Sequence, residues 1–188
     1  MKKNNQLIHK NYSLFHKLLH KKKIISDSKI VLSDKKNNTR FKVGQTDIIQ
    51  GTDHPTILIV ESSKIDGKYG IKLRCESLTK EPFIRFDSDG PAHRNDDFSI
   101  DLEDQMVSTP HFNTFDQNGL YIAYKNDTLK DEKKSNVIVK DINFGVSLFC
   151  METSCSLNDG NFPEIFDPNT PIPFNIDNGL NISNLNFD

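Results

Sequence analysis

The chain has 188 residues, of which 35% are hydrophobic, and a formal net charge of -2 at pH 7. This length suits one domain. No segment reaches the roughly 20 consecutive apolar residues of a membrane span, and the basic start lacks the apolar run of a signal peptide. Its three cysteines, Cys75, Cys150 and Cys155, form neither a C-x-x-C pair nor a disulfide framework. We therefore expect a cytoplasmic protein that does not span a membrane.

The charges are unevenly distributed along the chain. The first 42 residues contain twelve Lys and Arg against two Asp, whereas seven Asp and Glu and no basic residue follow Lys140. Such asymmetry is typical of a chain that contacts a polyanion at one end and a basic partner at the other. A second interpretation places the basic N-terminal segment on the acidic C-terminal segment of the same molecule.

Residues 6–25 are predicted to form a helix, because apolar residues recur at steps of three and four and make one stripe. His9, His16 and His20 lie near its polar flank. No Cys or carboxylate accompanies these histidines and neighbouring lysines repel cations, so we predict no metal site there. Residues 1–28 form the first unit of the predicted organisation, a basic amphipathic helix.

The next part of the chain is predicted to form β-strands. Segments rich in β-branched and aromatic side chains are separated by the turn-forming residues Asn, Gly, Pro and Asp, which predicts strands within residues 29–33, 39–50, 56–63, 69–77 and 81–88. The Asp66-Gly67 dipeptide predicts a hairpin turn. Together these segments indicate an antiparallel meander rather than an alternation of strands and helices.

The second half of the chain is more varied. We expect a long loop with a short helical turn over residues 88–110, and then two strands, over 111–116 and 119–125, joined by a turn at Asn118-Gly119. A solvated loop over 125–136 and a helix over 141–155 follow. Asp141 is placed to cap the helix. We predict an α+β fold with a curved antiparallel sheet, a core domain over residues 29–158, and an acidic, Asn/Pro-rich segment over 159–188. That segment is either extended and pinned by its apolar residues or disordered.

One candidate site stands out in residues 84–97, IRFDSDGPAHRNDD. Strand alternation turns Ile84 and Phe86 toward the core, so Arg85 and Asp87 share the opposite face. The Gly90-Pro91 turn returns His93 toward the strand end, and Pro110 precedes His111 at the next strand. Arg85, Asp87, His93 and His111 are therefore predicted to converge at one sheet edge.

This set of side chains suits phosphodiester chemistry. One histidine can take the proton of a ribose 2′-hydroxyl and the other can protonate the leaving 5′-oxygen. Arg85 can hold the charge that develops on the phosphate, and Asp87 can fix a histidine tautomer. The alternative is structural: Arg85 and Asp87 form an ion pair at the end of a strand, and both histidines cap loops.

The segments FIRFDSDGPAHRN, TPHFNTF and GLYIAY resemble an uncharacterised family of small bacterial and phage proteins. Its signature reads R-x-D-x-x-G-P-x-H-x-N, then P-H-x-H. They are also distantly similar to TumE-type toxins of toxin–antitoxin modules. The signature positions are occupied here by Arg85, Asp87, Gly90, Pro91, His93, Asn95, Pro110 and His111. This resemblance implies a mobile-element protein that acts on RNA.

The chain departs from that signature in two ways. Asn113 stands where the second histidine of P-H-x-H is expected, so this copy would lack a catalytic group if that histidine is catalytic. An acidic insert follows His93 and carries Asp96, Asp97, Asp101, Glu103 and Asp104. Because carboxylates repel phosphates, both departures favour binding to a protein.

Two functions from different classes follow from these observations. The first is a phage or plasmid accessory protein that acts on RNA or an RNA–protein complex, as a metal-independent endoribonuclease that needs no cofactor. The second is a non-catalytic inhibitor of the anti-CRISPR type, whose acidic residues bind a basic RNA-guided nuclease.

Overall fold

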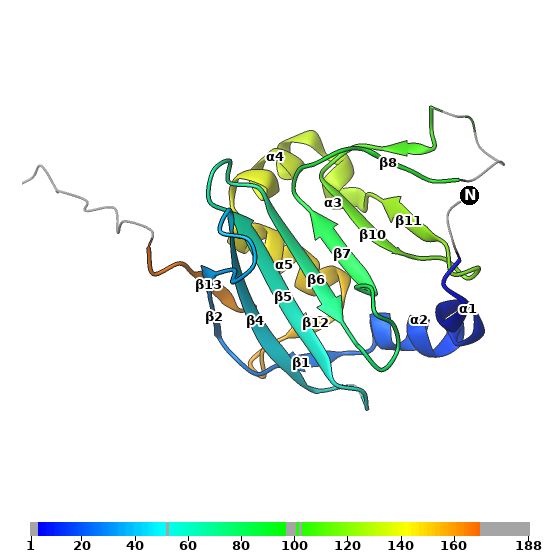
Figure 1. Ribbon diagram of the computed structural model, residues 1–188, viewed down its shortest axis with the longest axis horizontal. Helices are drawn as coiled ribbons and strands as arrows, with labels where there is room; N and C mark the ends of the chain where they lie inside the picture. The colour runs from blue at the N-terminus through cyan, green and yellow to red at the C-terminus, as the bar shows by residue number, and fades with distance from the viewer. Residues whose placement is uncertain (1–3, 52, 97–100, 102, 170–188) are drawn as a thin grey trace, which may run out of the picture.

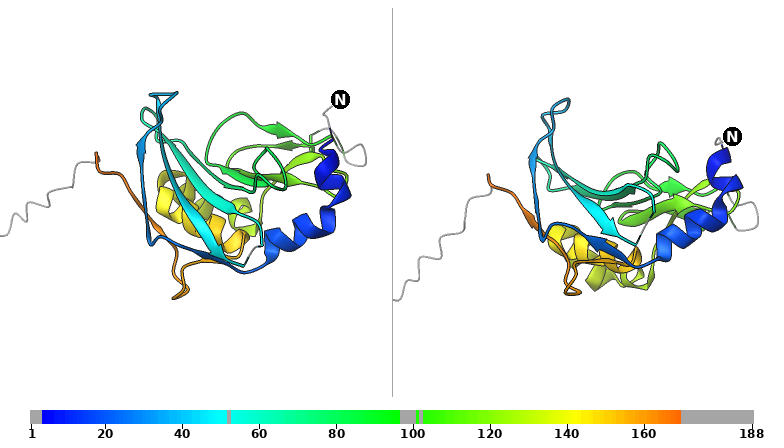
Figure 2. Two further views of the ribbon diagram at one scale, coloured as in Figure 1. Left: turned by 60° about the horizontal axis from the view of Figure 1, so that its bottom comes forward. Right: turned by 90° about the horizontal axis from the view of Figure 1, so that it is seen from below.

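The computed structural model describes residues 4–51, 53–96, 101 and 103–169. It confirms the predicted α+β class. A curled sheet forms a half-barrel (Figures 1 and 2). The helices are α1 (Gln6–Lys10), α2 (Tyr12–His20), α3 (Asp127–Lys130), α4 (Glu132–Lys140) and α5 (Ile142–Glu152). Of these, α3, α4 and α5 cover one face of the sheet, and α1 and α2 lie at one end of it (Figures 1 and 2).

The main sheet follows the strand order β11-β10-β7-β6-β5-β4-β1-β12, and β3 pairs with β4. Its strands are β1 (Lys23–Ile25), β3 (Ser33–Asp34), β4 (Phe41–Gln50), β5 (Thr56–Ser63), β6 (Tyr69–Arg74), β7 (Ile84–Asp87), β10 (His111–Phe115), β11 (Tyr121–Tyr124) and β12 (Cys155–Ser156). Two small ribbons complete the described strands: β2 (Lys29–Val31) with β13 (Glu164–Phe166), and β8 (His93–Arg94) with β9 (Met106–Val107).

The sheet is mixed rather than wholly antiparallel as expected. The strands from β4 through β11 pair antiparallel, as the meander predicts, whereas β12 runs parallel to β1 and β13 runs parallel to β2. Both parallel partners come from the part of the chain after α5. The chain returns there beside its own beginning, a long-range pairing that local sequence patterns do not specify.

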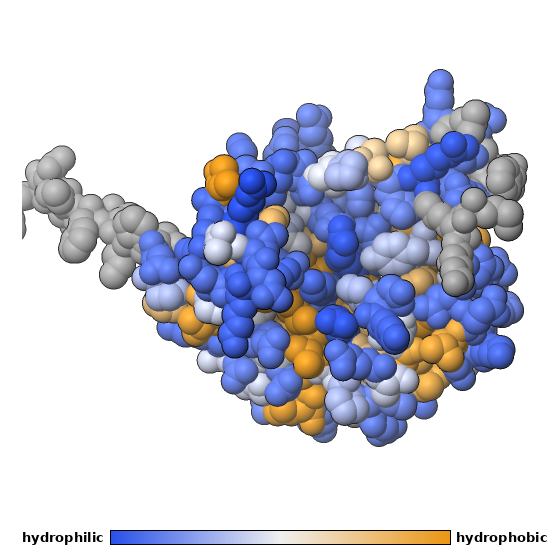
Figure 3. All heavy atoms as spheres, viewed as in Figure 1, coloured by the Kyte–Doolittle hydropathy of each residue, from blue (hydrophilic) through white to orange (hydrophobic). Residues whose placement is uncertain are grey.

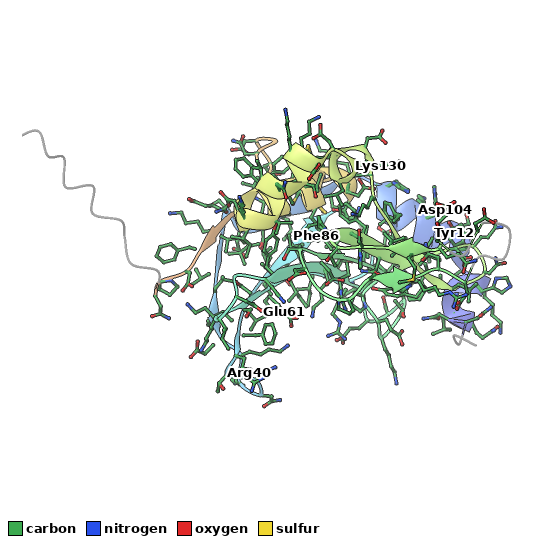
Figure 4. All side chains as sticks on the ribbon, turned by 90° about the horizontal axis from the view of Figure 1, so that it is seen from above. Tyr12, Arg40, Glu61, Phe86, Asp104 and Lys130 are labelled. Atoms are coloured by element: carbon green, nitrogen blue, oxygen red, sulfur yellow. The ribbon has the colours of Figure 1, made fainter. Side chains whose placement is uncertain are left out.

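The core lies between the sheet and α5. Phe86 on β7 and Phe112 on β10 are fully buried, and Phe112 stacks on Phe149 of α5 with ring centroids 6.4 Å apart. Figure 4 shows Phe86 between the sheet and the helices, while Glu61 of β5 points to the opposite side. That opposite side, which we call the open face, carries the residues that alternate with the core residues.

Helix α5 approaches the sheet closely at Gly145. A Cβ atom at this position would lie 2.2 Å from the hydroxyl oxygen of Tyr69. That hydroxyl donates a hydrogen bond to the carbonyl oxygen of Ile138 in α4. Asp141 caps α5 as predicted, because its side chain accepts a hydrogen bond from the backbone N–H of Asn143 at 2.8 Å.

The helix predicted over residues 6–25 ends earlier than expected. It is broken at Asn11, α2 stops at His20, and Lys23–Ile25 form strand β1. The ammonium group of Lys23 is buried and donates to the carbonyl oxygens of Leu19, Lys21 and Thr153 at 2.7–2.9 Å. Two helix ends, those of α2 and α5, therefore share one cation, which suits their C-terminal dipoles.

Two loop predictions were also wrong. The segment predicted as a solvated loop forms α3 and much of α4, capped by the side chains of Asn126 and Asp131. The loop predicted over 88–110 contains β8 and β9, whereas the short helical turn predicted within it is present at residues 103–105, where the N–H of Gln105 donates to the carbonyl oxygen of Asp101. In the last segment, β13 favours the extended interpretation up to Asn169; residues 170–188 lie outside the described part of the chain.

Candidate functional site

A hollow of about 270 Å³ opens on the open face above β7 and β10. It brings together the four residues singled out in the sequence: Arg85, Asp87, His93 and His111. The sequence predicts that these residues meet at a sheet edge. Because β7 and β10 are interior strands, the residues meet instead on the face of the sheet. Figure 3, viewed from this side, shows that hydrophilic side chains cover most of the surface.

Arg85 and Asp87 form the floor of this site pocket. They are two residues apart on β7, on the face opposite buried Ile84 and Phe86. The guanidinium Nε lies 2.7 and 2.8 Å from the two carboxylate oxygens, and Nη2 lies 2.7 Å from Oδ2. Burial lowers the pKa of Arg85, but the hydrogen bonds and charge of Asp87 outweigh burial and raise it. The guanidinium is therefore charged and held against the Asp87 carboxylate.

His111 lies directly across from Asp87 in the β7–β10 pairing, after a cis Thr109–Pro110 peptide bond. Its side chain is buried, and its Nε2 atom is 3.7 Å from Oδ2 of Asp87. Nδ1 is buried and has no well-aligned hydrogen-bond partner among the described residues, although the backbone groups of Val107 and Ser108 lie close enough to act on the pKa of the ring. Burial lowers the pKa of His111, and the nearby Asp87 carboxylate only partly opposes this shift. The imidazole is therefore neutral at pH 7, and one of its nitrogens can accept a proton.

His93 and Asn95 hold the outer edge of the sheet. Among the described strands β11 is the last in its sheet, so none of them pairs with its outward backbone groups. The Nε2 of His93 donates to the carbonyl oxygen of Tyr121 at 3.2 Å. The amide of Asn95 donates to the carbonyl oxygen of Ala123 at 2.7 Å and accepts from its N–H at 2.8 Å. These side chains replace a missing strand, which accounts for the H-x-N spacing.

The two histidines nonetheless lie close together. Their ring centroids are 6.3 Å apart, with the rings nearly perpendicular. Hence His93 both supports the edge of β11 and lines the site pocket beside His111. The structural interpretation is confirmed for the Arg85–Asp87 ion pair, whereas His93 supports the edge of β11 rather than a loop and still lines the pocket.

Two further residues belong to the site: Asn113, which the sequence marked only as a departure from the signature, and Tyr121, which was not singled out from the sequence. Asn113 donates to Oδ2 of Asp87 at 2.9 Å and so helps to orient the carboxylate. Tyr121 lines the pocket, and burial raises its pKa to about 12, with Arg85 opposing the shift. The place of Asn113 on the site face follows from strand alternation, because it lies two residues after His111 and faces the same side.

The acidic residues proposed as a partner surface are accessible where they are described. Asp96, Asp101, Glu103 and Asp104 are all exposed, and Asp97 lies outside the described residues. Within the described ranges, no cluster of three or more His, Cys, Asp or Glu could hold a metal ion. The described helices are also too short or too polar to cross a membrane.

Comparison with protein-family models, with curated proteins and with solved structures finds no match to this chain. The resemblance to the signature family and to TumE-type toxins therefore stays a prediction.

Proposed function

We propose that the chain binds RNA at the site pocket and cleaves its phosphodiester backbone without a metal ion. Neutral His111 accepts the proton of a ribose 2′-hydroxyl. The 2′-oxygen attacks phosphorus and the bond from phosphorus to the 5′-oxygen breaks. His93 in its protonated form donates a proton to that oxygen, which leaves a 2′,3′-cyclic phosphate and a 5′-hydroxyl.

The other residues of the pocket position and stabilise these groups. Asn113 holds the Asp87 carboxylate in place, and that carboxylate lies beside the His111 ring and orients it. Arg85 binds Asp87 through Nε and Nη2, so in the described part of the structure the N–H groups of Nη1 remain to contact a phosphate. Developing charge on the phosphate would thus meet a donor that is already held in place.

One observation carries this proposal: two histidines and an arginine from separate segments meet in one open pocket, and one of the histidines is neutral at pH 7. Acid–base catalysis requires such groups within reach of one substrate. In many buried ion pairs the carboxylate has no histidine beside it. Here a lowered histidine pKa coincides with access to a hollow.

The experiment is RNA cleavage in the presence of EDTA. His111→Gln replaces the imidazole ring with an amide, which can still form hydrogen bonds but cannot titrate. It should lower the cleavage rate about 10²-fold or more. His93→Gln should do the same, whereas His16→Ala, an exposed histidine of α2, should have no effect. Circular dichroism must show that each variant is folded. Cleavage that persists at the wild-type rate in both site variants would reject the proposal.

A second candidate function is favoured by the exposed acidic residues beside the site. Here the chain, as an anti-CRISPR-type inhibitor from a phage, binds the basic nucleic-acid channel of an RNA-guided nuclease through Asp96, Asp97, Asp101, Glu103 and Asp104. Carboxylates on an exposed surface steer a basic partner and set specificity. Reversal of Asp96, Asp101 and Asp104 to Lys should slow association with such a partner. Binding that ignores both these changes and salt would exclude this function.

A further inference from the structure

A second hollow of about 550 Å³ adjoins the site pocket on the open face. It is lined by Asn5, Glu81, Pro82, Arg85, Phe115 and Tyr121, among others. Arg85 and Tyr121 line both hollows, so the two adjoin at these side chains. A ligand that placed a phosphate against Arg85 could therefore reach into the second hollow past them.

One carboxylate in this second hollow is held in a fixed position. Oε2 of Glu81 accepts hydrogen bonds from the hydroxyl of Thr79 at 2.8 Å and from the amide of Asn5 at 3.3 Å. Asn5 is itself fixed, because its side chain caps α1 by accepting from the N–H groups of Leu7 and Ile8. The hydrogen bond from Thr79 lowers the pKa of Glu81. The group is thus ionised at neutral pH and only accepts hydrogen bonds.

The neighbouring walls are aromatic and apolar. Phe115 and Tyr121 lie edge to face with ring centroids 5.0 Å apart, and Pro82 completes this wall. The raised pKa of Tyr121 keeps its hydroxyl protonated, so that ring carries no charge. A flat ligand could stack here, since unpaired bases are commonly recognised by stacking on aromatic rings together with hydrogen bonds to their edges.

We propose that the second hollow is a base-binding subsite that selects guanine in single-stranded RNA. This inference rests on the proposed function of the site pocket and names its substrate. Oε2 of Glu81 is occupied by Thr79 and Asn5, and among the described residues Oε1 remains to accept from a ligand. Guanine presents two adjacent donors, N1–H and the N2 amino group, and one carboxylate oxygen can accept from both.

The other bases present a less suitable edge. Adenine and cytosine each place a ring-nitrogen acceptor beside their amino group, and that acceptor would be repelled by Glu81. Uracil has one N–H between two carbonyl acceptors. With guanine in the second hollow and its 3′-phosphate at Arg85, the ribose would lie next to the site pocket that His111 lines. Cleavage is then expected after guanosine.

The test is the binding of nucleoside 3′-monophosphates, measured by calorimetry without any cleavage step. The wild-type protein should bind 3′-GMP about tenfold or more tightly than 3′-AMP, 3′-CMP or 3′-UMP, the discrimination typical of one paired base contact. Inosine 3′-monophosphate lacks the N2 amino group and should fall between them. Glu81→Gln should abolish the preference for guanine, and the exposed control Glu76→Gln should retain it.

Failure of this inference can be told apart from failure of the proposed function. Equal binding of all four nucleotides, or a guanine preference that survives Glu81→Gln, would overturn the subsite, and cleavage in EDTA would still test the site pocket separately. If the protein cleaves RNA after every base equally, the subsite is likewise rejected while the catalytic proposal stands. A guanine preference without cleavage would support the subsite and reject the catalysis.

Discussion

Replacement of Asn95 tests whether the motif supports the edge of the sheet. Its side-chain amide makes two hydrogen bonds to the backbone of Ala123, at 2.7 and 2.8 Å. Ala123 is 2% exposed, so water cannot readily replace these bonds. Asn95→Ala removes both partners at once. Asn95→Asp keeps an acceptor for the N–H of Ala123 but turns a carboxylate oxygen toward its carbonyl oxygen.

The expected loss of stability follows from the two bonds. Each buried group left without a partner costs about 1–3 kcal/mol, and a typical hydrogen bond contributes about 1 kcal/mol net. Asn95→Ala should therefore lower the free energy of unfolding by about 2–4 kcal/mol. Asn95→Asp should lower it at least as much, because it keeps one bond but places two acceptors against each other.

Urea unfolding measures these losses, and amide exchange separates the two variants. The N–H of Ala123 should exchange faster than in the wild type when residue 95 is Ala, and should stay better protected when it is Asp. The matched control is Asn118→Ala, in an exposed hairpin turn, where a change below about 1 kcal/mol is expected. If Asn95→Ala changes stability by less than 0.5 kcal/mol, on the order of an ordinary surface substitution, the edge-support interpretation is wrong.

Three further predictions concern packing, titration and charge. Gly145→Ala should cost about 2–4 kcal/mol in urea unfolding, because its Cβ meets the Tyr69 hydroxyl, and a Tyr69→Leu background should reduce that cost. Because the pKa of His111 is lowered, the unfolded chain binds the proton first as pH falls below about 6.5. This residue should then remove up to about 1.4 kcal/mol per pH unit, a slope that His111→Gln should lack. A plot of log association constant for RNA against log salt concentration should have a slope of about −1, the value for one or two phosphate contacts. A slope of about −5 would contradict an open face whose positive charges are mostly paired.

The strands of the meander could be predicted because local signals agreed. Thr56–Ser63 was predicted with its observed bounds, since apolar alternation and turn residues mark both ends. The hairpin after it turns at Gly67, which has a φ of +68°, as the Asp-Gly pair indicated. Where such signals coincide, strand pairing follows from sequence order alone.

Elsewhere, contacts distant in the sequence decided the structure. Lys23–Ile25 continues a helical apolar stripe, yet pairing with β4 and β12 makes it a strand. The segment at 125–136 is charged and reads as a loop, but Asn126 and Asp131 cap two short helices there. Those caps were visible in the sequence, and the helices they begin were overlooked because the segment carries few apolar residues.

The sequence predicts the principal residues of the candidate site, but not the structural contacts that each of them makes. Alternation correctly placed Arg85 and Asp87 on one face, and the two proline turns indicated that His93 and His111 lie near them. The second task of His93, at the carbonyl oxygen of Tyr121, depends on β11 being the last strand of its sheet. No local pattern reveals which strand is last.

The charge arrangement of the open face bears on how RNA would be recognised there. Four basic groups described on this face are already paired: Lys35 and Lys72 with Glu61, Lys68 with Asp89, and Arg85 with Asp87. Non-specific RNA binding depends on unpaired positive charge, so this face supplies little of it. Recognition of RNA at this site would then have to come from contacts to a base and to one phosphate, which are the contacts that Glu81 and Arg85 are placed to make. A balanced face therefore favours a selective nuclease of modest affinity over a general RNA-binding surface, and the ratio of 3′-GMP to 3′-AMP affinity at constant salt measures that difference directly.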